Sequence, residues 1–269
     1  EPITVQYVLT GDALTLYPRT LVIADRESRV TVVEHHLGGF EDSDNRRLVA
    51  AAVELFVAAG ARVEYSAVQD YGMETDVVIR RFAEVERDGQ VQWNLGEFGG
   101  GVSMARHESW LKEPGASAES SVVFFGSQAQ YQEFTAHLEH LAPHTQSDLF
   151  ARGVMAGRAR STFTGVTHIR KGASQSNGRQ REETLMLSPQ ARADAVPSLL
   201  IDEHDVFAAH AASAGPVEET TLHYLMSRGL AEEEAIALVV HGFLAPVVDR
   251  LPEAIQAVVW EHVERKMGQ

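Results

Sequence analysis

The stretch AAHAASAGPVEETTLHYLMSRGL, residues 208–230, marks a change in the periodicity of the sequence. Short runs before it alternate polar and apolar residues, whereas apolar residues after it recur at spacings of three and four. Pro216 suits the first position of a helix, two glutamates suit its first turn, and Gly229 suits its end. The stretch therefore predicts a β domain that gives way to helices, with His210 near the junction.

Residues 1 to about 209 have the pattern of many short strands separated by turns. QVQWNL at 90–95 alternates polar and apolar residues, and STFTGVTHI at 161–169 is rich in β-branched residues. Turn signals recur roughly every 11 to 17 residues, a rhythm typical of hairpins, sandwiches or solenoids. LVAAAVELFVAA at 48–59 has high helix propensity, yet its neighbours predict a strand there.

Two further helices are predicted after Gly229. One begins near Ala231 and the other near Pro252, and both have apolar residues on one face, as amphipathic helices do. The inward faces are predicted to consist of Ile236, Val239, Val240, Phe243, Leu244 and Val247 in the first, and Ile255, Val258, Val259 and Val263 in the second. The sequence thus predicts a β domain over 1–210 and a small helical domain over 216–269.

Composition excludes several classes of function. The chain of 269 residues carries a net charge of −15, which disfavours binding to nucleic acid or to an anionic membrane surface. It contains no cysteine, so it can supply neither a disulfide nor a thiolate ligand or nucleophile. No apolar run is long enough to span a bilayer and no signal-like segment is visible, so we expect a cytoplasmic protein.

Two groups of polar residues raise the question of catalysis or metal binding. His137, His140 and His144 would share one face of a helix, but the strand pattern favours a structural role for them. Carboxylates cluster near the end of the β domain, and carbohydrate-cleaving enzymes built on β-solenoids use paired carboxylates. These acids are Asp194, Asp202, Glu203 and Asp205, and a solvated acidic face is the alternative interpretation.

His210 is the remaining candidate for a functional residue. Its neighbours are alanines on both sides, so nothing bulky blocks the approach of a metal or a partner to the imidazole. Imidazole is a ligand for borderline metals, including iron. A packed core histidine is the alternative.

Gly99-Gly100-Gly101 lacks the Lys-Ser/Thr ending of a phosphate-binding loop, so nucleotide hydrolysis by that route is excluded.

The stretch PSLLIDEHDVFAAHAASAGPVEETTLHYLMSRGLAEEEAIALVVHGFL, residues 197–244, resembles the C-terminal signature of the SufB/SufD family. The matching elements are Asp205-Val206, His210, Gly215, Tyr224-Leu225 and Arg228-Gly229. The segments at 17–36, 140–173 and 185–202 are also similar to the family, so the resemblance covers nearly the whole chain.

The resemblance implies a right-handed parallel β-helix (a β-solenoid) with a small C-terminal helical domain. It implies a non-enzymatic scaffold for iron–sulfur cluster assembly that binds a SufC-type ABC ATPase on its terminal helices, for which Arg228 and Glu234 are docking candidates. It further implies pairing with a SufB-type paralogue, or with itself as a homodimer. His210 then becomes a candidate for cluster or metal assembly.

Two departures from the B-type paralogue indicate a SufD-like chain. The B-type protein uses a cysteine in cluster assembly, and this chain has none. An acid follows the signature histidine in the B-type protein, whereas Ala211 stands here. A cluster would therefore be transient and shared with a partner chain, and none is expected in the isolated chain.

Overall fold

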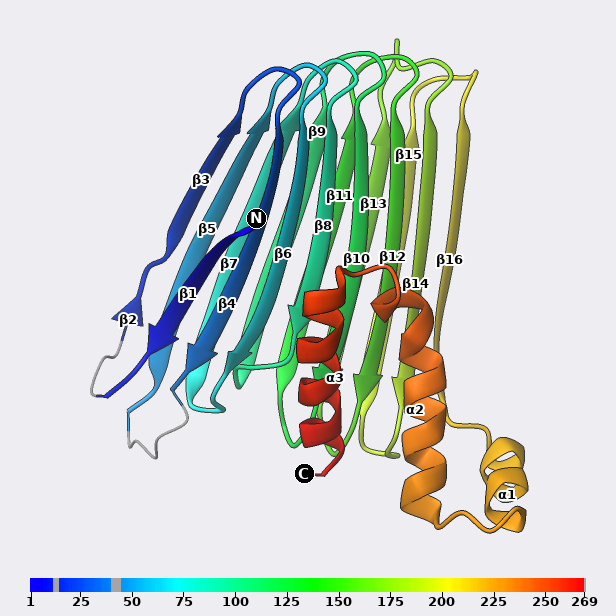
Figure 1. The fold of residues 1–269 in the computed structure, drawn as a ribbon. Coiled ribbons are helices and arrows are strands. Elements are labelled where there is room, and N and C mark those ends of the chain that lie inside the picture. Colours follow the sequence, from blue (N-terminus) through cyan, green and yellow to red (C-terminus); the bar gives the residue numbers. More distant parts are fainter. Residues whose placement is uncertain (12–14, 40–44, 269) are drawn as a thin grey trace.

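The computed structural model describes residues 1–11, 15–39 and 45–268. The chain winds into a β-solenoid whose strands alternate between two parallel sheets (Figure 1). Sheet A contains β1 Ile3–Leu9, β4 Arg29–Gly38, β6 Arg62–Tyr71, β8 Gln90–Glu97, β10 Ser117–Gly126, β12 Gln146–Met155, β14 Asn177–Met186 and β16 Phe207–Pro216, hydrogen-bonded in that order. The prediction of a mainly β, solenoidal fold is confirmed.

Sheet B is the second wall of the solenoid. It contains β2 Thr15–Leu16, β3 Arg19–Ala24, β5 Arg47–Val57, β7 Thr75–Val85, β9 Val102–Leu111, β11 Tyr131–His140, β13 Arg160–Ile169 and β15 Arg192–Ile201. The segment at 48–59 falls in β5, so the strand predicted there against helix propensity is confirmed. Alternate residues of β5, among them Val49, Val53 and Leu55, point into the core and are fully buried.

Aromatic and branched side chains fill the space between the two sheets. Trp93, Tyr65 and Phe124 are among the largest of them. The interior also holds charge: Arg81 donates a hydrogen bond to Glu97 at 2.7 Å, and both side chains are 1% exposed. A buried pair of this kind is tolerated because each charge neutralises the other.

The glycine run at 99–101 follows β8, where the chain passes close to the coil before it. A Cβ atom on Gly99 would lie 1.9 Å from the backbone nitrogen of Tyr71, and Gly100 has a φ of +82°. The Gly100 N–H also donates to the Tyr71 carbonyl at 2.7 Å. Close backbone approach therefore explains these glycines, in agreement with the exclusion of a phosphate loop.

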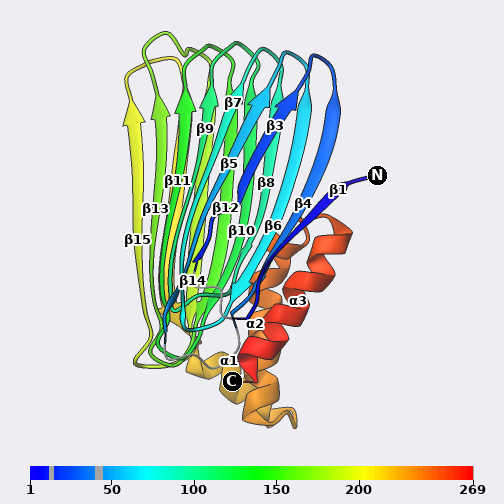
Figure 2. The ribbon, with the colours of Figure 1, turned by 90° about the vertical axis from the view of Figure 1, so that its left-hand side faces the viewer.

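Three helices follow the solenoid: α1 Glu219–Ser227, α2 Glu232–Val248 and α3 Glu253–Met267. Figures 1 and 2 show α2 and α3 lying along the outer face of sheet A, while α1 projects below its end. Three residues of the predicted inward face of α2, Val240, Leu244 and Val247, are fully buried as expected. They share a second core with residues such as Val123 and Phe125 of β10.

One prediction about the helices is wrong. Pro216 is the last residue of β16 and pairs with Met186 of β14, and the first helix starts only at Glu219. A proline is compatible with an edge strand because its missing N–H can be on the unpaired side. The division into folding units at 1–210 and 216–269 stays a prediction.

An arginine joins α2 to the solenoid. Arg152 on β12 donates a hydrogen bond to the carbonyl of Phe243 in α2 and forms an ion pair with Glu183 of β14. Its guanidinium carbon lies 4.9 Å from the centroid of the Phe243 ring. One side chain therefore contacts both the helix and the next-to-last strand of sheet A.

Candidate assembly site at the last coil of the solenoid

The last coil consists of β15 and β16, and each forms the edge of its sheet. An edge strand leaves one row of backbone N–H and C=O groups available for pairing. Large apolar side chains are exposed on the same coil, including Val196, Leu200 and Phe207. An additional strand could therefore extend either sheet beyond the last coil.

His210 lies on β16 in register with Gln180 of β14. Residues paired in a parallel sheet project to the same side, so the imidazole is on the inner side of sheet A together with buried Gln180. It is nevertheless exposed, because β16 is the last strand. Within the described residues its side chain makes no hydrogen bond or ion pair. The structure thus excludes a packed core histidine at this position.

Glu182 is a residue that the sequence analysis missed. It lies two positions beyond Gln180 on the same side of β14, in register with Ala212, and is 7% exposed. One carboxylate oxygen accepts a hydrogen bond from Thr184 at 2.8 Å, while the other is buried without a partner among the described residues. Burial, together with the nearby charge of Glu183, raises the pKa of Glu182 to about 7.

A small cavity lies beside this carboxylate. Its volume is about 10 Å³, and its lining includes Gln180, Glu182, Pro197 and Ala212. That is close to the smallest space that holds one water molecule. The alanines of β16 therefore leave room next to Glu182 that larger side chains would fill.

The outer side of the same strands is basic. Arg179 and Arg181 alternate with Gln180 and Glu182 along β14 and are exposed on the opposite face. With Arg250 and Phe150 they line a groove of about 240 Å³ beside β16. Arg250 donates to Asp148 at 2.6 Å and stacks over Phe150 at 4.6 Å. In so acidic a chain, this groove is suited to an anionic group or an acidic segment.

Three of the four clustered acids near the end of the β domain are engaged in local side-chain contacts. Asp194 pairs with Arg192 at 2.8 Å, and Asp202 lies 3.0 Å from His168. Glu203 accepts hydrogen bonds from the backbone of Gly172 and His204. Among the described residues, these three acids bind different partners, so the geometry gives no support to the carbohydrate-cleaving alternative.

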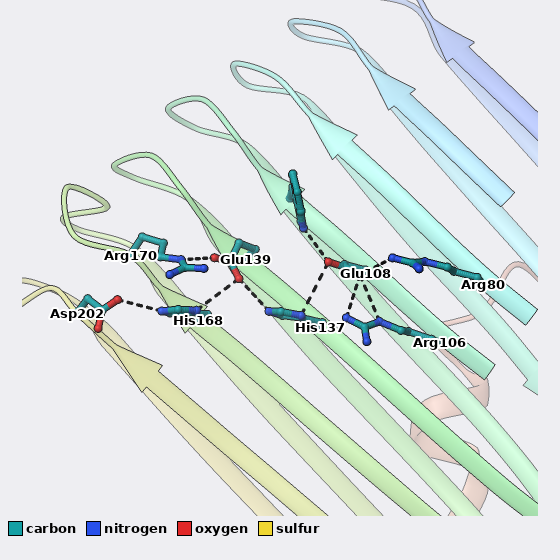
Figure 3. A network of polar contacts seen from close by, with 9 residues as sticks. Arg80, Arg106, Glu108, His137, Glu139, His168, Arg170 and Asp202 are labelled. Carbon is teal, nitrogen blue, oxygen red and sulfur yellow. Dashed lines mark hydrogen bonds and ion pairs between the residues drawn. The ribbon is translucent and has the colours of Figure 1, made fainter. Parts of the chain in front are cut away.

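A row of histidines and acids crosses the outer face of sheet B (Figure 3). His137 lies between Glu139, at 2.8 Å, and Glu108, at 3.9 Å. His168 lies between Glu139, at 3.5 Å, and Asp202. Arginines pair with the same acids from neighbouring strands: Arg80 and Arg106 with Glu108, and Arg170 with Glu139. Each charge in the row is matched by an opposite one, which is typical of a structural network.

The three histidines at 137, 140 and 144 do not form a site. His137 faces outward, whereas His140 is fully buried between the hydroxyls of Thr145 and Ser147, each at 2.8 Å. His144 lies in the following turn with a φ of +61°. Over residues 1–11, 15–39 and 45–268, no group of three His, Asp or Glu side chains could hold a metal ion.

The two docking candidates lie on the helices, apart from the last coil. Arg228 follows α1 and stacks over the ring of Tyr224 at 5.1 Å. Glu234 caps α2, since its carboxylate accepts a hydrogen bond from the N–H of Ala231 at 2.9 Å. Both side chains are exposed. In the described ranges, no helix is long and apolar enough to cross a membrane.

Comparison with known proteins identifies the class to which this solenoid belongs. The profile of the SUF system FeS cluster assembly SufBD core domain matches residues 7–243. The chain therefore belongs to the SufBD family of iron–sulfur cluster assembly proteins, and the resemblance noted from sequence is confirmed.

Individual relatives agree with this assignment. The iron-sulfur cluster assembly protein SufD of Bacillus subtilis (strain 168) is 37% identical over 268 residues, which are 99% of this chain and 61% of that protein. A SufBD family protein of Mycobacterium leprae (strain TN) is 34% identical over 93% of this chain and 29% of its own length. SufB of Bacillus subtilis (strain 168) is 26% identical over 93% of this chain and 54% of its length. The chain thus spans about three fifths, or less, of these relatives.

Proposed function

We propose that the chain is a SufD-type, non-enzymatic component of a cytoplasmic machinery that assembles iron–sulfur clusters. The observation that carries the proposal is the last coil, where His210 lies exposed on an edge strand and has no side-chain partner among the described residues. The chain has no thiolate, so an imidazole and nearby oxygens are its donors toward iron. The cluster is cargo, held transiently and completed by ligands of a partner chain.

The partner on this coil is a SufB-type paralogue, with a second copy of the chain as the alternative. Edge strands β15 and β16 and the exposed side chains of Val196, Leu200 and Phe207 support pairing at this end. Backbone hydrogen bonds to an edge and burial of apolar side chains are the two sources of affinity in strand addition. The small alanines that flank His210 allow another backbone to approach the imidazole closely.

A SufC-type ABC ATPase docks on the hairpin of α1 and α2. α1 has no buried residue, and large apolar side chains are exposed on both helices: Tyr224 and Met226 on α1, and Leu238 on α2. Aromatic, methionine and arginine side chains are enriched at protein interfaces. Arg228 is the better of the two docking candidates to test, since a change at Glu234 would also remove the cap of α2.

Charge reversal tests the dock. Arg228→Glu should lower binding of the ATPase at least tenfold, whereas Arg158→Glu, an exposed arginine in a solenoid turn, should leave it unchanged. Isothermal titration with the purified ATPase measures both. Equal affinities for the two variants would place the dock elsewhere. Point substitutions are preferable to deletion of residues 217–269. The deletion would also remove α2 and α3 and so expose Val123 and Phe125, which these helices cover.

His210→Ala tests the assembly role. The side chain is exposed and makes no polar contact with the part of the chain that the structure describes, so the substitution should leave the melting temperature within about 1 °C, consistent with a change under ~0.5 kcal/mol at the surface. Iron bound per complex, after reconstitution with the cysteine-containing paralogue, should fall sharply. Unchanged iron content in an intact complex would refute the role of His210.

A further inference from the structure

We propose that Glu182 is a second ligand in the His210 site and that the two side chains form half of a binding site for ferrous iron, which a partner chain completes. This inference rests on the proposed function. It starts from a feature that the fold by itself does not require: a carboxylate oxygen buried without a partner in the described structure.

Glu182 differs from the other buried acids. The described residues include six buried carboxylates, and the other five each lie against an arginine or a histidine. These pairs are Glu34 with His36, Asp70 with Arg265, Glu97 with Arg81, Glu108 with Arg106, and Glu139 with Arg170. Glu182 has the hydroxyl of Thr184 and no cation among the described residues. A cation is therefore the missing element of its environment.

The sheet prevents nearby arginines from filling that role. Arg179 and Arg181 alternate with Glu182 along β14 and so project from the opposite face. Glu183 also faces outward, where it pairs with Arg152. The inner side of β14 thus presents the carboxyl group of Glu182 toward the end of the solenoid, whereas Arg179 and Arg181 line the groove on the other side, which His210 also borders.

The position of Glu182 relative to His210 is fixed by strand register. His210 pairs with Gln180, and Glu182 with Ala212, so the two side chains are diagonal neighbours on the same side of adjacent strands. Diagonal neighbours in a sheet are about 7–8 Å apart at the backbone, within reach of two long side chains that converge on one ion. On the side of β16, the small cavity beside Glu182 is lined by Ala211 and Ala212.

The chemistry of the pair suits ferrous iron. Imidazole is a ligand for iron, and a carboxylate adds a hard, negatively charged oxygen that compensates part of the charge of a divalent cation. Two ligands do not make a stable site, which agrees with the absence of any three-ligand group among residues 1–11, 15–39 and 45–268. The remaining ligands would come from the chain that covers the last coil.

Anaerobic titration of Fe²⁺ into the complex with the SufB-type paralogue tests this inference. Glu182→Gln keeps the size and the acceptor for Thr184 but removes the charge, and it should weaken Fe²⁺ binding at least tenfold. Glu119→Gln, which removes an exposed carboxylate from β10, is the matched control and should bind as the unmodified chain does. Binding is read as iron retained after equilibrium dialysis.

Melting temperature without metal gives an independent measurement. A buried, partly unpaired carboxylate is unfavourable, so Glu182→Gln should melt at the same or a higher temperature than the unmodified chain. If that variant fails to fold or pair, Glu182→Met replaces it. A lower melting temperature with undiminished Fe²⁺ affinity would identify Glu182 as structural and overturn the inference.

His210→Ala in the same titration separates the two proposals. Loss of Fe²⁺ binding in His210→Ala, with normal binding in Glu182→Gln, would refute the role of Glu182 and leave the proposed function standing. Normal binding in both variants would refute the role of His210 and, with it, the half-site. Weakened binding in both, with the control unaffected, is the result we expect.

Discussion

The buried imidazole of His140 should make the protein lose stability as the pH falls below neutral. Burial lowers the pKa of His140 to about 4, from an ordinary value of 6.5. Its two contacts are the neutral hydroxyls of Thr145 and Ser147, which supply no negative charge to an imidazolium. The unfolded chain therefore takes up the proton at higher pH than the folded chain does.

The size of the effect follows from this difference in pKa. Because the folded value is the lower one, stability is intact above about pH 6.5 and is lost as the pH falls from there toward about 4. One pKa unit corresponds to about 1.4 kcal/mol, so the full loss from His140 is about 3 kcal/mol, of which about 2 kcal/mol falls between pH 7 and pH 5.

Urea denaturation at pH 7 and pH 5 measures this loss in the unmodified chain and in His140→Gln. Glutamine still bonds to a hydroxyl but does not titrate, so the variant should lose about 2 kcal/mol less over this interval. Other buried histidines, such as His107, contribute equally to both proteins and cancel. His223→Gln, an exposed position on α1, should behave as the unmodified chain does. Equal losses in all three proteins would contradict the reasoning.

Three further substitutions test the packing. Gly99→Ala should lower the unfolding free energy by on the order of 3 kcal/mol or prevent folding, because the added Cβ would clash with the Tyr71 backbone. At Gly215 an added Cβ would have no atom within 4 Å, so Gly215→Ala should change the unfolding free energy by less than ~0.5 kcal/mol. Leu244→Ala, in the core between α2 and sheet A, should cost about 2–5 kcal/mol in one cooperative transition. A separate early transition of the helical signal would show that α2 and α3 unfold on their own.

The sequence predicted the architecture better than it predicted the site. The strand at 48–59 could be assigned against its helix propensity because stacked coils decide the conformation of each new coil. Within it, inward Val49, Ala51 and Val53 alternate with the less buried Ala50 and Ala52. The end of β16 was misplaced because pairing with β14 extends through Pro216, and such pairing is invisible in local sequence.

Glu182 was missed for a related reason. It lies in the run RQREE, residues 179–183, which resembles a solvated charged segment. Only the alternation of strand residues, once the register is known, shows that Gln180 and Glu182 face inward while the arginines face outward. The basic groove formed with Arg250 could not be predicted either, because it depends on where the end of α2 lies over β12.

Arg152 links the proposed ATPase-binding helices to the proposed iron site at the last coil. Its guanidinium donates a hydrogen bond to the carbonyl of Phe243 in α2 and also forms an ion pair with Glu183, the residue next to Glu182. An ATPase that shifts α2 would alter both bonds, so we expect nucleotide-driven movement of the helices and the affinity of the last coil for iron to be thermodynamically coupled. Such coupling is reciprocal: the factor by which the ATPase changes iron affinity is the factor by which bound iron changes affinity for the ATPase.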